Sequence, residues 1–477
     1  MANNSKLKTL ALTLLITGAI DIIRNLPASA LFGSTVIFFF LFAGIFFLIP
    51  TALVSAELNA NVNEGGIYHW VRAAFGERIA FLAIWLQWVN NLLWFPTILS
   101  FIVGTAAYLI NPVLAQNKFY LVASILGVFW TLTLVNLRGL RLSTRFTSFC
   151  ALIGLIIPML LIIGLGSVWV FQGNPLQMHV TPHNLLPNLH SSSNWMALTA
   201  IILGFCGMEL TAVHIHDVHE PHVTFPRALS YATALILTTM TLGSLAIAYV
   251  LPHSEISMVN GTIQTFEYFF SAYHLTWLIP VVTLMLVIGS LGCVVSWVIS
   301  PIKGIAQAGN HGFLPPFFTT LNHRGMPARL LLLQAMVVTL VCMAFLLLPS
   351  VSASYWLLTN LSTQLYLCMY VIMFIAAIRL RFTQTFSSRD FTIPGGRAGS
   401  VLICLLGLVG CSITMIVGLI PPDSLSHLGG GYTAYITLFC GGLLAMLVPI
   451  LPFYWYHRQY GRAHRLTLLK RDDSEAA

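Results

Sequence analysis

Charge is what this sequence has least of. Asp, Glu, Lys and Arg together make up only 8% of its 477 residues, whereas hydrophobic residues make up 57%. A soluble domain carries about 25% charged residues, so this composition excludes a soluble globular protein and indicates a chain that lies in a lipid bilayer. No segment between the apolar stretches is long enough for a separate soluble domain, and we expect a single membrane domain over 1–477.

Paired cysteines and a leader-like N-terminus are also missing. All eight cysteines fall within apolar stretches and none forms a CxxC pair, so packing roles are expected rather than a disulfide framework. The first apolar run is longer than the hydrophobic region of a signal peptide and lacks a small-residue cleavage motif. We therefore expect it to remain as the first helix.

About twelve apolar stretches are each long enough to cross a ~30 Å hydrocarbon core. They cover about 9–32, 35–57, 79–110, 119–137, 148–171, 194–216, 228–251, 273–301, 328–348, 352–380, 400–420 and 431–456. Five spans, five more and two more, with the first and sixth spans both broken at mid-membrane as described below, predict an all-α membrane protein with a LeuT-like 5+5 inverted repeat and two peripheral helices. Its expected parts are repeat one at about 9–171, repeat two at about 194–380, peripheral helices at about 400–456 and a short cytoplasmic tail at 457–477.

Basic residues lie almost entirely on one side of this topology. With the N-terminus inside, the inside positions are Lys6, Lys8, Arg72, Arg78, Arg138, Arg141, Arg145, Arg227, Lys303, Arg324, Arg329, Arg379, Arg381, Arg389, Arg397, Arg458, Arg462, Arg465, Lys470 and Arg471. The exceptions are Lys118, in an outside loop, and Arg24, within the membrane. This positive-inside pattern supports the span count and cytoplasmic termini. It also accounts for the net charge of +8 without a nucleic-acid partner.

Two opposite charges interrupt the first span, which reads Asp21-Ile-Ile-Arg24-Asn25-Leu-Pro27. An ionised side chain at bilayer depth costs about 2.5–3.5 kcal/mol on insertion scales. Two of them beside a proline therefore predict a functional break in the helix. Arg24 could bind a substrate carboxylate or only pair with Asp21 or Glu209. Asp21 could bind an amine, carry a proton or serve only as the counter-ion.

The sixth span has a break of its own, Gly204-Phe205-Cys206-Gly207-Met-Glu209. Each glycine costs a helix about 1 kcal/mol relative to alanine, so the pair marks a place to unwind and free backbone groups for a ligand. Glu209 is a functional candidate because it is a lone acid within the membrane; a structural hydrogen bond to unwound backbone is the alternative. We expect the ligand between 21–27 and 204–209, with helix-end dipoles holding its opposite charges.

Two further groups are candidates for gating. Glu57 ends span two near the inside surface and is interpreted as structural or as part of a gate. His214, His216 and Asp217 form the densest set of potential metal ligands, but they lie at a helix end before Pro221. A pH-responsive gate or an ordinary hydrated helix end is therefore expected there, and no metal site or cofactor is predicted.

Six motifs, in order, resemble those of the amino acid–polyamine–organocation superfamily and, within it, the bacterial glutamate/γ-aminobutyrate antiporters. They are Ala56-Glu57…Glu64-Gly-Gly, Gly207-Met-Glu209…Val213-His214, Ser296-Trp297…Pro301-x-Lys-Gly304, Tyr366-Leu-Cys-x-Tyr370, Phe391-Thr-Ile-Pro-Gly-Gly396 and Pro421-Pro-Asp423. The chain departs from these antiporters at Arg24, where they carry a tyrosine. It also ends about 20 residues after its last span, so the long C-terminal plug of those antiporters is not expected.

The resemblance implies a secondary active transporter of the bacterial inner membrane, not an enzyme, that exchanges amino acids by alternating access. The expected substrate-binding residues are Asp21, Arg24, Asn25, Phe205, Cys206, Gly207, Glu209, Trp297 and Tyr366, and the gating or pH-sensing residues are Glu57, His214, His216 and Asp217. Phe205 and Trp297 are expected to cover the ligand. A proton-coupled symporter of another amino acid or amine, and a sensor that binds without transport, remain alternatives, as do monomer and homodimer.

A membrane acyl or glycosyl transferase is a weaker alternative. Such an enzyme needs a polar catalytic constellation that opens to one surface, and only the histidine cluster offers one. For the transporter, the expected partners are an amino acid substrate and the lipid bilayer, with protons where transport is proton-coupled.

Overall fold

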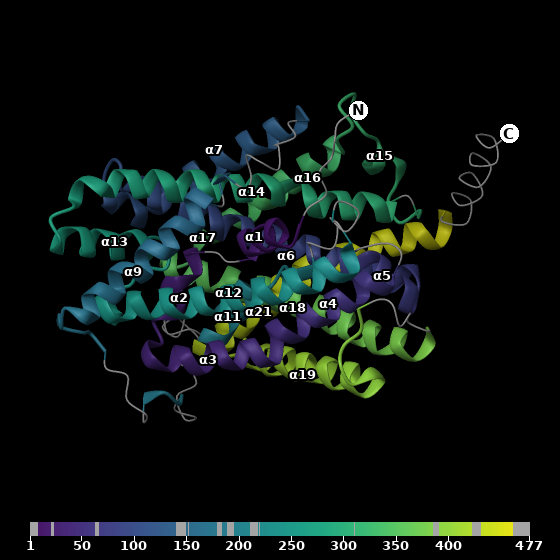
Figure 1. Ribbon diagram of the computed structural model, residues 1–477. Coiled ribbons are helices and arrows are strands. Elements are labelled where there is room, and N and C mark those ends of the chain that lie inside the picture. Colours follow the sequence, from purple (N-terminus) through teal and green to yellow (C-terminus); the bar gives the residue numbers. More distant parts are fainter. Residues whose placement is uncertain are drawn as a thin grey trace, which may run out of the picture.

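Long apolar helices make up most of the computed structural model (Figure 1). The structure describes residues 8–20, 23–62, 66–139, 149–150, 152–178, 184–187, 195–209, 218, 220–309, 311–384, 391–421 and 431–460. No β-strand occurs in these ranges, which confirms the predicted all-α class.

The helices are placed as the hydropathy of the sequence requires. The first part of the chain contains α1 (Thr9–Ile20), α2 (Leu26–Ala30), α3 (Val36–Ala43), α4 (Ile49–Asn61), α5 (Ile67–Phe75), α6 (Glu77–Ala107), α7 (Lys118–Leu137) and α9 (Ile157–Phe171). The second part contains α11 (Ala197–Phe205), α12 (Pro221–Val250), α13 (Gly261–Ala272), α14 (Ile279–Gly309), α15 (Pro316–Thr319), α16 (Ala328–Cys342), α17 (Ala344–Leu347), α18 (Val351–Thr383), α19 (Gly396–Val417) and α21 (Gly431–Leu447). Short irregular turns are η1 (Ile23–Asn25), which is 3₁₀-helical, and η3 (Gly44–Leu48) and η5 (Leu152–Ile156), which are π-helical.

Ten of the described helices are long and apolar enough to cross a membrane, and a bent pair makes eleven. The pair joins Thr9–Gly18 to Ile23–Ala30 at an angle of 41°, so the first span is interrupted where the charges predicted a break. Pro27 lies in the first turn of α2, where its missing N–H costs no helical hydrogen bond. The remaining expected span, about 194–216, is described only as far as Glu209.

Helix α6 is the centre of the bundle. It packs against α18, α14, α5 and α16, and 94% of its most apolar window is buried. Only 11% of the corresponding window of the last span, Gly431–Tyr460, is buried, as expected for a peripheral helix. Polar side chains fix α6 to its neighbours: Trp88 Nε1 donates to Gln334 Oε1 of α16 at 3.1 Å, and Ser362 of α18 bonds to Asn90.

Candidate functional site

Arg24 is buried at the break of the first span. Its side chain is 1% exposed, and its Nη1 atom donates to Thr97 Oγ1 of α6 at 2.9 Å. The guanidinium carbon lies 5.3 Å from the ring centroid of Trp94, which is also on α6. Among the residues that the structure describes, the Nε atom has no hydrogen-bond partner. One face of a buried cation is therefore stabilised by α6, while part of its hydrogen-bonding capacity is unused.

An aromatic pair connects Arg24 to the break of the sixth span. Trp94 lies 5.2 Å from Trp297 of α14, centroid to centroid. A Cβ atom placed on Gly207 would lie 3.5 Å from the Trp297 ring and 3.7 Å from Ile20 of α1. The contacts therefore run from Arg24 through Trp94 and Trp297 to the backbone of the sixth span, and the expected role of Trp297 in covering the ligand stays a prediction.

The sixth span unwinds at the predicted glycine. Helix α11 ends at Phe205, Cys206 is extended (φ −72°, ψ 148°), and Gly207 has φ +115°, a conformation that favours glycine. The N–H of Gly207 donates to the Tyr370 hydroxyl of α18 at 2.8 Å. A Cβ on Gly204 would lie 2.9 Å from Asn25 Nδ2, so Asn25 packs directly on α11 and the two breaks are adjacent.

Three neutral donors surround the buried carboxylate of Glu209, which is 1% exposed. Its Oε1 atom accepts from Tyr366 Oη at 2.6 Å and from Gln87 Nε2 at 3.1 Å. Its Oε2 atom accepts from the Tyr370 hydroxyl. Glu209 is thus hydrogen-bonded to side chains of α6 and α18, whereas the sequence indicated unwound backbone as its alternative partner.

The charged side chains at the two breaks, Arg24 and Glu209, do not form an ion pair with each other in the described part of the chain. The other predicted residues at the break have local contacts: the Phe205 ring lies 5.8 Å from Phe40 of α3, and the Cys206 thiol donates to the Ile202 carbonyl at 3.2 Å. Their assignments to substrate binding, and that of Phe205 to covering the ligand, stay predictions.

Four predicted residues lie outside the described residues: Asp21, His214, His216 and Asp217. Among the described residues, no group of three His, Cys, Asp or Glu side chains could hold a metal ion.

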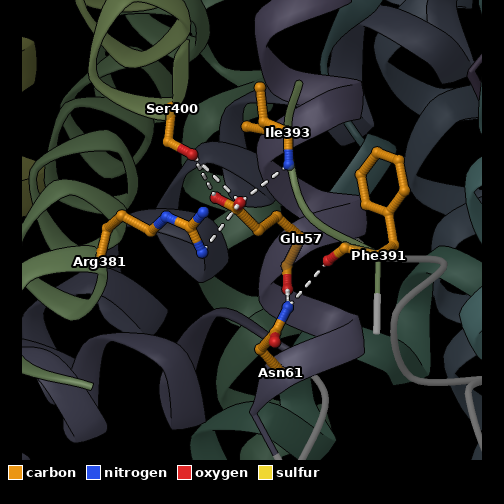
Figure 2. Close-up of polar contacts among 6 residues, drawn as sticks. All are labelled: Glu57, Asn61, Arg381, Phe391, Ile393 and Ser400. Atoms are coloured by element: carbon orange, nitrogen blue, oxygen red, sulfur yellow. Dashed lines mark hydrogen bonds and ion pairs between the residues drawn. The ribbon is translucent and has the colours of Figure 1, made fainter. Parts of the chain in front are cut away.

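Glu57 belongs to a second, separate cluster at the end of α4 (Figure 2). Its carboxylate contacts Arg381 of α18, Ser400 of α19 and the N–H of Ile393. The sequence indicates Glu57, and Ile393 lies in one of the quoted motifs, but nothing in the sequence pairs Glu57 with Ile393, Arg381 or Ser400.

Sequence reasoning missed Gln87 and Thr97 as site residues. Both are polar residues within an apolar span, a signal that was available but that many other positions in the chain share. Tyr370 stood in a quoted motif, yet only the structure shows that its hydroxyl contacts both Gly207 and Glu209.

Two interrupted spans are in contact at their breaks, where a buried cation and a buried acid lie within a bundle of long apolar helices. This arrangement defines a multi-pass transporter of LeuT-like fold. The chain matches the amino acid permease family model over residues 7–444 and belongs to that family, within the amino acid–polyamine–organocation superfamily.

Known proteins resemble the chain in sequence and in fold. It is 42% identical to an uncharacterised transporter of Legionella pneumophila, over 89% of this chain and 92% of the relative. It is 28% identical to a glutamate/γ-aminobutyrate antiporter of Lactococcus lactis, over 97% of this chain and 92% of the relative. A manganese transporter of Eremococcus coleocola has a similar fold, with a TM-score of 0.55 and 12% identity over 94% of both chains.

Proposed function

We propose that this protein transports amino acids across the bacterial inner membrane by alternating access, with Arg24 binding the substrate carboxylate. The observation that carries the proposal is the environment of Arg24: a 1% exposed guanidinium with an unused Nε donor and, in the described ranges, no ion pair. A buried charge without an opposite charge beside it costs several kcal/mol, which one hydrogen bond to Thr97 and the Trp94 ring offset only in part. A carboxylate would offset that cost through a two-pronged hydrogen bond.

The break in the sixth span supports the same assignment. The sequence predicts that helix-end dipoles hold the opposite ends of a zwitterion, but the Gly207 N–H donates to Tyr370. This amide is therefore already satisfied, whereas Arg24 keeps an unused donor. The geometry favours a side-chain cation over this amide as the carboxylate ligand.

Exchange of glutamate/γ-aminobutyrate type is our first choice of mechanism, because the Lactococcus lactis antiporter aligns over nearly the whole chain. A proton-coupled symporter is the second candidate. Glu209 favours it, since a buried acid bonded to two hydroxyls and one amide could take up and release a proton as those contacts change.

Counterflow in proteoliposomes tests the proposal with a panel of acidic, neutral and basic amino acids and amines, under several pH gradients. Wild-type protein is expected to exchange at least one of them. Arg24→Lys keeps the charge but loses the guanidinium fork, so we expect KM to rise about tenfold. Arg24→Tyr, the residue of the glutamate/γ-aminobutyrate antiporters, is expected to change the preference among substrate charges.

Arg379→Gln is the matched control, because Arg379 is an exposed arginine that lies 5.0 Å from the Phe75 ring, away from the site. It is expected to exchange like wild type. Absence of exchange for every compound and gradient would refute transport of amino acids. Unchanged KM and preference in both Arg24 variants would refute carboxylate binding by Arg24.

A further inference from the structure

The carboxylate of Glu57, near the end of α4, contacts three other parts of the chain: α18, the segment before α19, and α19 itself (Figure 2). Its Oε1 atom accepts the Ile393 N–H at 2.9 Å, and both oxygens lie 3.1 Å from the Ser400 hydroxyl. Nη1 of Arg381 lies 3.7 Å from Oε1. The side chains of Glu57 and Arg381 are only 3% and 11% exposed. We call these four residues the Glu57 cluster.

The contacts of the Glu57 cluster are unequal in length. The connection from α4 to the segment before α19 is short and is reinforced by Asn61, whose Nδ2 donates to the carbonyls of Glu57 at 2.8 Å and Phe391 at 2.9 Å. The ion pair with Arg381 is the longest contact, beyond the 2.7–2.9 Å typical of a charge-assisted hydrogen bond. Helix α4 and the start of α19 are therefore joined by short hydrogen bonds. Within the cluster, the ion pair is the contact that adds α18, which also packs along α19.

Helix α18 extends from the Glu57 cluster to the candidate site. Tyr370, which bonds to Gly207 and Glu209, precedes Arg381 by eleven residues on the same unbroken helix. At 1.5 Å per residue the two positions are about 16 Å apart along the axis. A displacement of the Arg381 end of α18 relative to α4 therefore changes the position of the tyrosines that hold the break of the sixth span.

We propose that the Glu57–Arg381 ion pair is a gate contact: it holds α18 against α4 while the cytoplasmic path is closed, and it separates when that path opens. The inference rests on the proposed function for its role in transport. Both residues lie at helix ends that the distribution of Lys and Arg assigns to the cytoplasmic side. Within the Glu57 cluster, the pair is the longest contact and the one that connects α4 to α18.

The test measures the distance between α18 and α19 by double electron–electron resonance, without substrate. Spin labels are placed at Phe382→Cys and Leu402→Cys, two positions that are each 59% exposed, with Cys440, which is also exposed, replaced by serine. Adding Glu57→Gln or Arg381→Gln is expected to introduce a second, longer population. Arg379→Gln, which removes an exposed arginine from the same helix, is expected to leave the wild-type distribution.

Transport then gives a second readout that a merely structural pair would not change. Loss of the ion pair shifts the population toward the cytoplasm-open state, so KM measured from that side falls and KM from the opposite side rises, each by about fivefold. Wild-type distance distributions in both Glu57→Gln and Arg381→Gln overturn the gate, whether or not an amino acid is transported. Equal KM changes on both sides also overturn it. If, in addition, the wild-type protein transports no amino acid, the result contradicts the proposed function as well as the gate.

Discussion

Tyr366 and Tyr370 lie one helical turn apart on α18, so both hydroxyls reach the carboxylate of Glu209. They differ in what else they hold. Tyr370 also accepts the Gly207 N–H, so Tyr370→Phe leaves a buried backbone donor unsatisfied, at a cost of about 1–3 kcal/mol. Tyr366→Phe removes a single hydrogen bond and is expected to cost about 1 kcal/mol. Thermal unfolding of the purified variants measures the difference.

The same two variants separate stability from transport. Tyr370→Phe is expected to slow exchange more than Tyr366→Phe, since it frees the unwound backbone of the sixth span. Equal effects of the two substitutions on both melting and exchange would show that the Gly207 contact does not matter.

At the scale of single residues, the sequence revealed the charges but not their partners. Arg24 and Glu209 were identified because an ion in an apolar run is costly and therefore conspicuous. Thr97 and Gln87 were not, because neutral polar residues are common in membrane helices. Their role depends on the rotation of α6 about its axis, which places Thr97 beside Arg24 and Gln87 beside Glu209. Hydropathy carries no information on that rotation.

At the scale of elements, two glycines let η5 and α14 cross in contact. A Cβ atom on Gly154 would lie 2.1 Å from the Cα atom of Gly289, closer than any real contact. Gly154→Ala should therefore push the two helices apart and destabilise the protein by about 1–3 kcal/mol. Gly164, further along the same span, has nothing within 4 Å of such a Cβ, so Gly164→Ala should be neutral or stabilise by up to about 1 kcal/mol.

Melting temperatures of the two alanine variants in one detergent measure this contrast. A Gly154→Ala protein as stable as Gly164→Ala would mean that the close crossing of η5 and α14 is not maintained in solution.

Breaks in helices were only partly predictable. Pro27 indicated the break in the first span, and Gly204 with Gly207 indicated the break in the sixth, because proline and glycine act on the backbone directly. The π-helical turns η3 and η5 were not predicted, since one extra residue per turn leaves an apolar run apolar.

At the scale of the whole molecule, the remaining question about topology is the sixth span. Four described spans separate Phe119, at the start of α7, from Leu321, between α15 and α16: Lys118–Leu137, Leu152–Phe171, Val223–Val250 and Thr276–Ala306. The expected span at about 194–216 would be a fifth crossing. An odd number of crossings puts Phe119 and Leu321 on opposite sides of the membrane, whereas an even number puts them on the same side.

Cysteine labelling in intact cells distinguishes these outcomes. Phe119 and Leu321 are 77% and 60% exposed, so Phe119→Cys and Leu321→Cys, with Cys440 replaced by serine, present comparable thiols. Because Lys and Arg concentrate on the inside, an impermeant maleimide should label Phe119→Cys in intact cells and Leu321→Cys only after permeabilisation. The reverse pattern would place the N-terminus outside. Labelling of both in intact cells would mean that the sixth segment does not cross, and a binding site between two broken membrane-spanning helices would then be untenable.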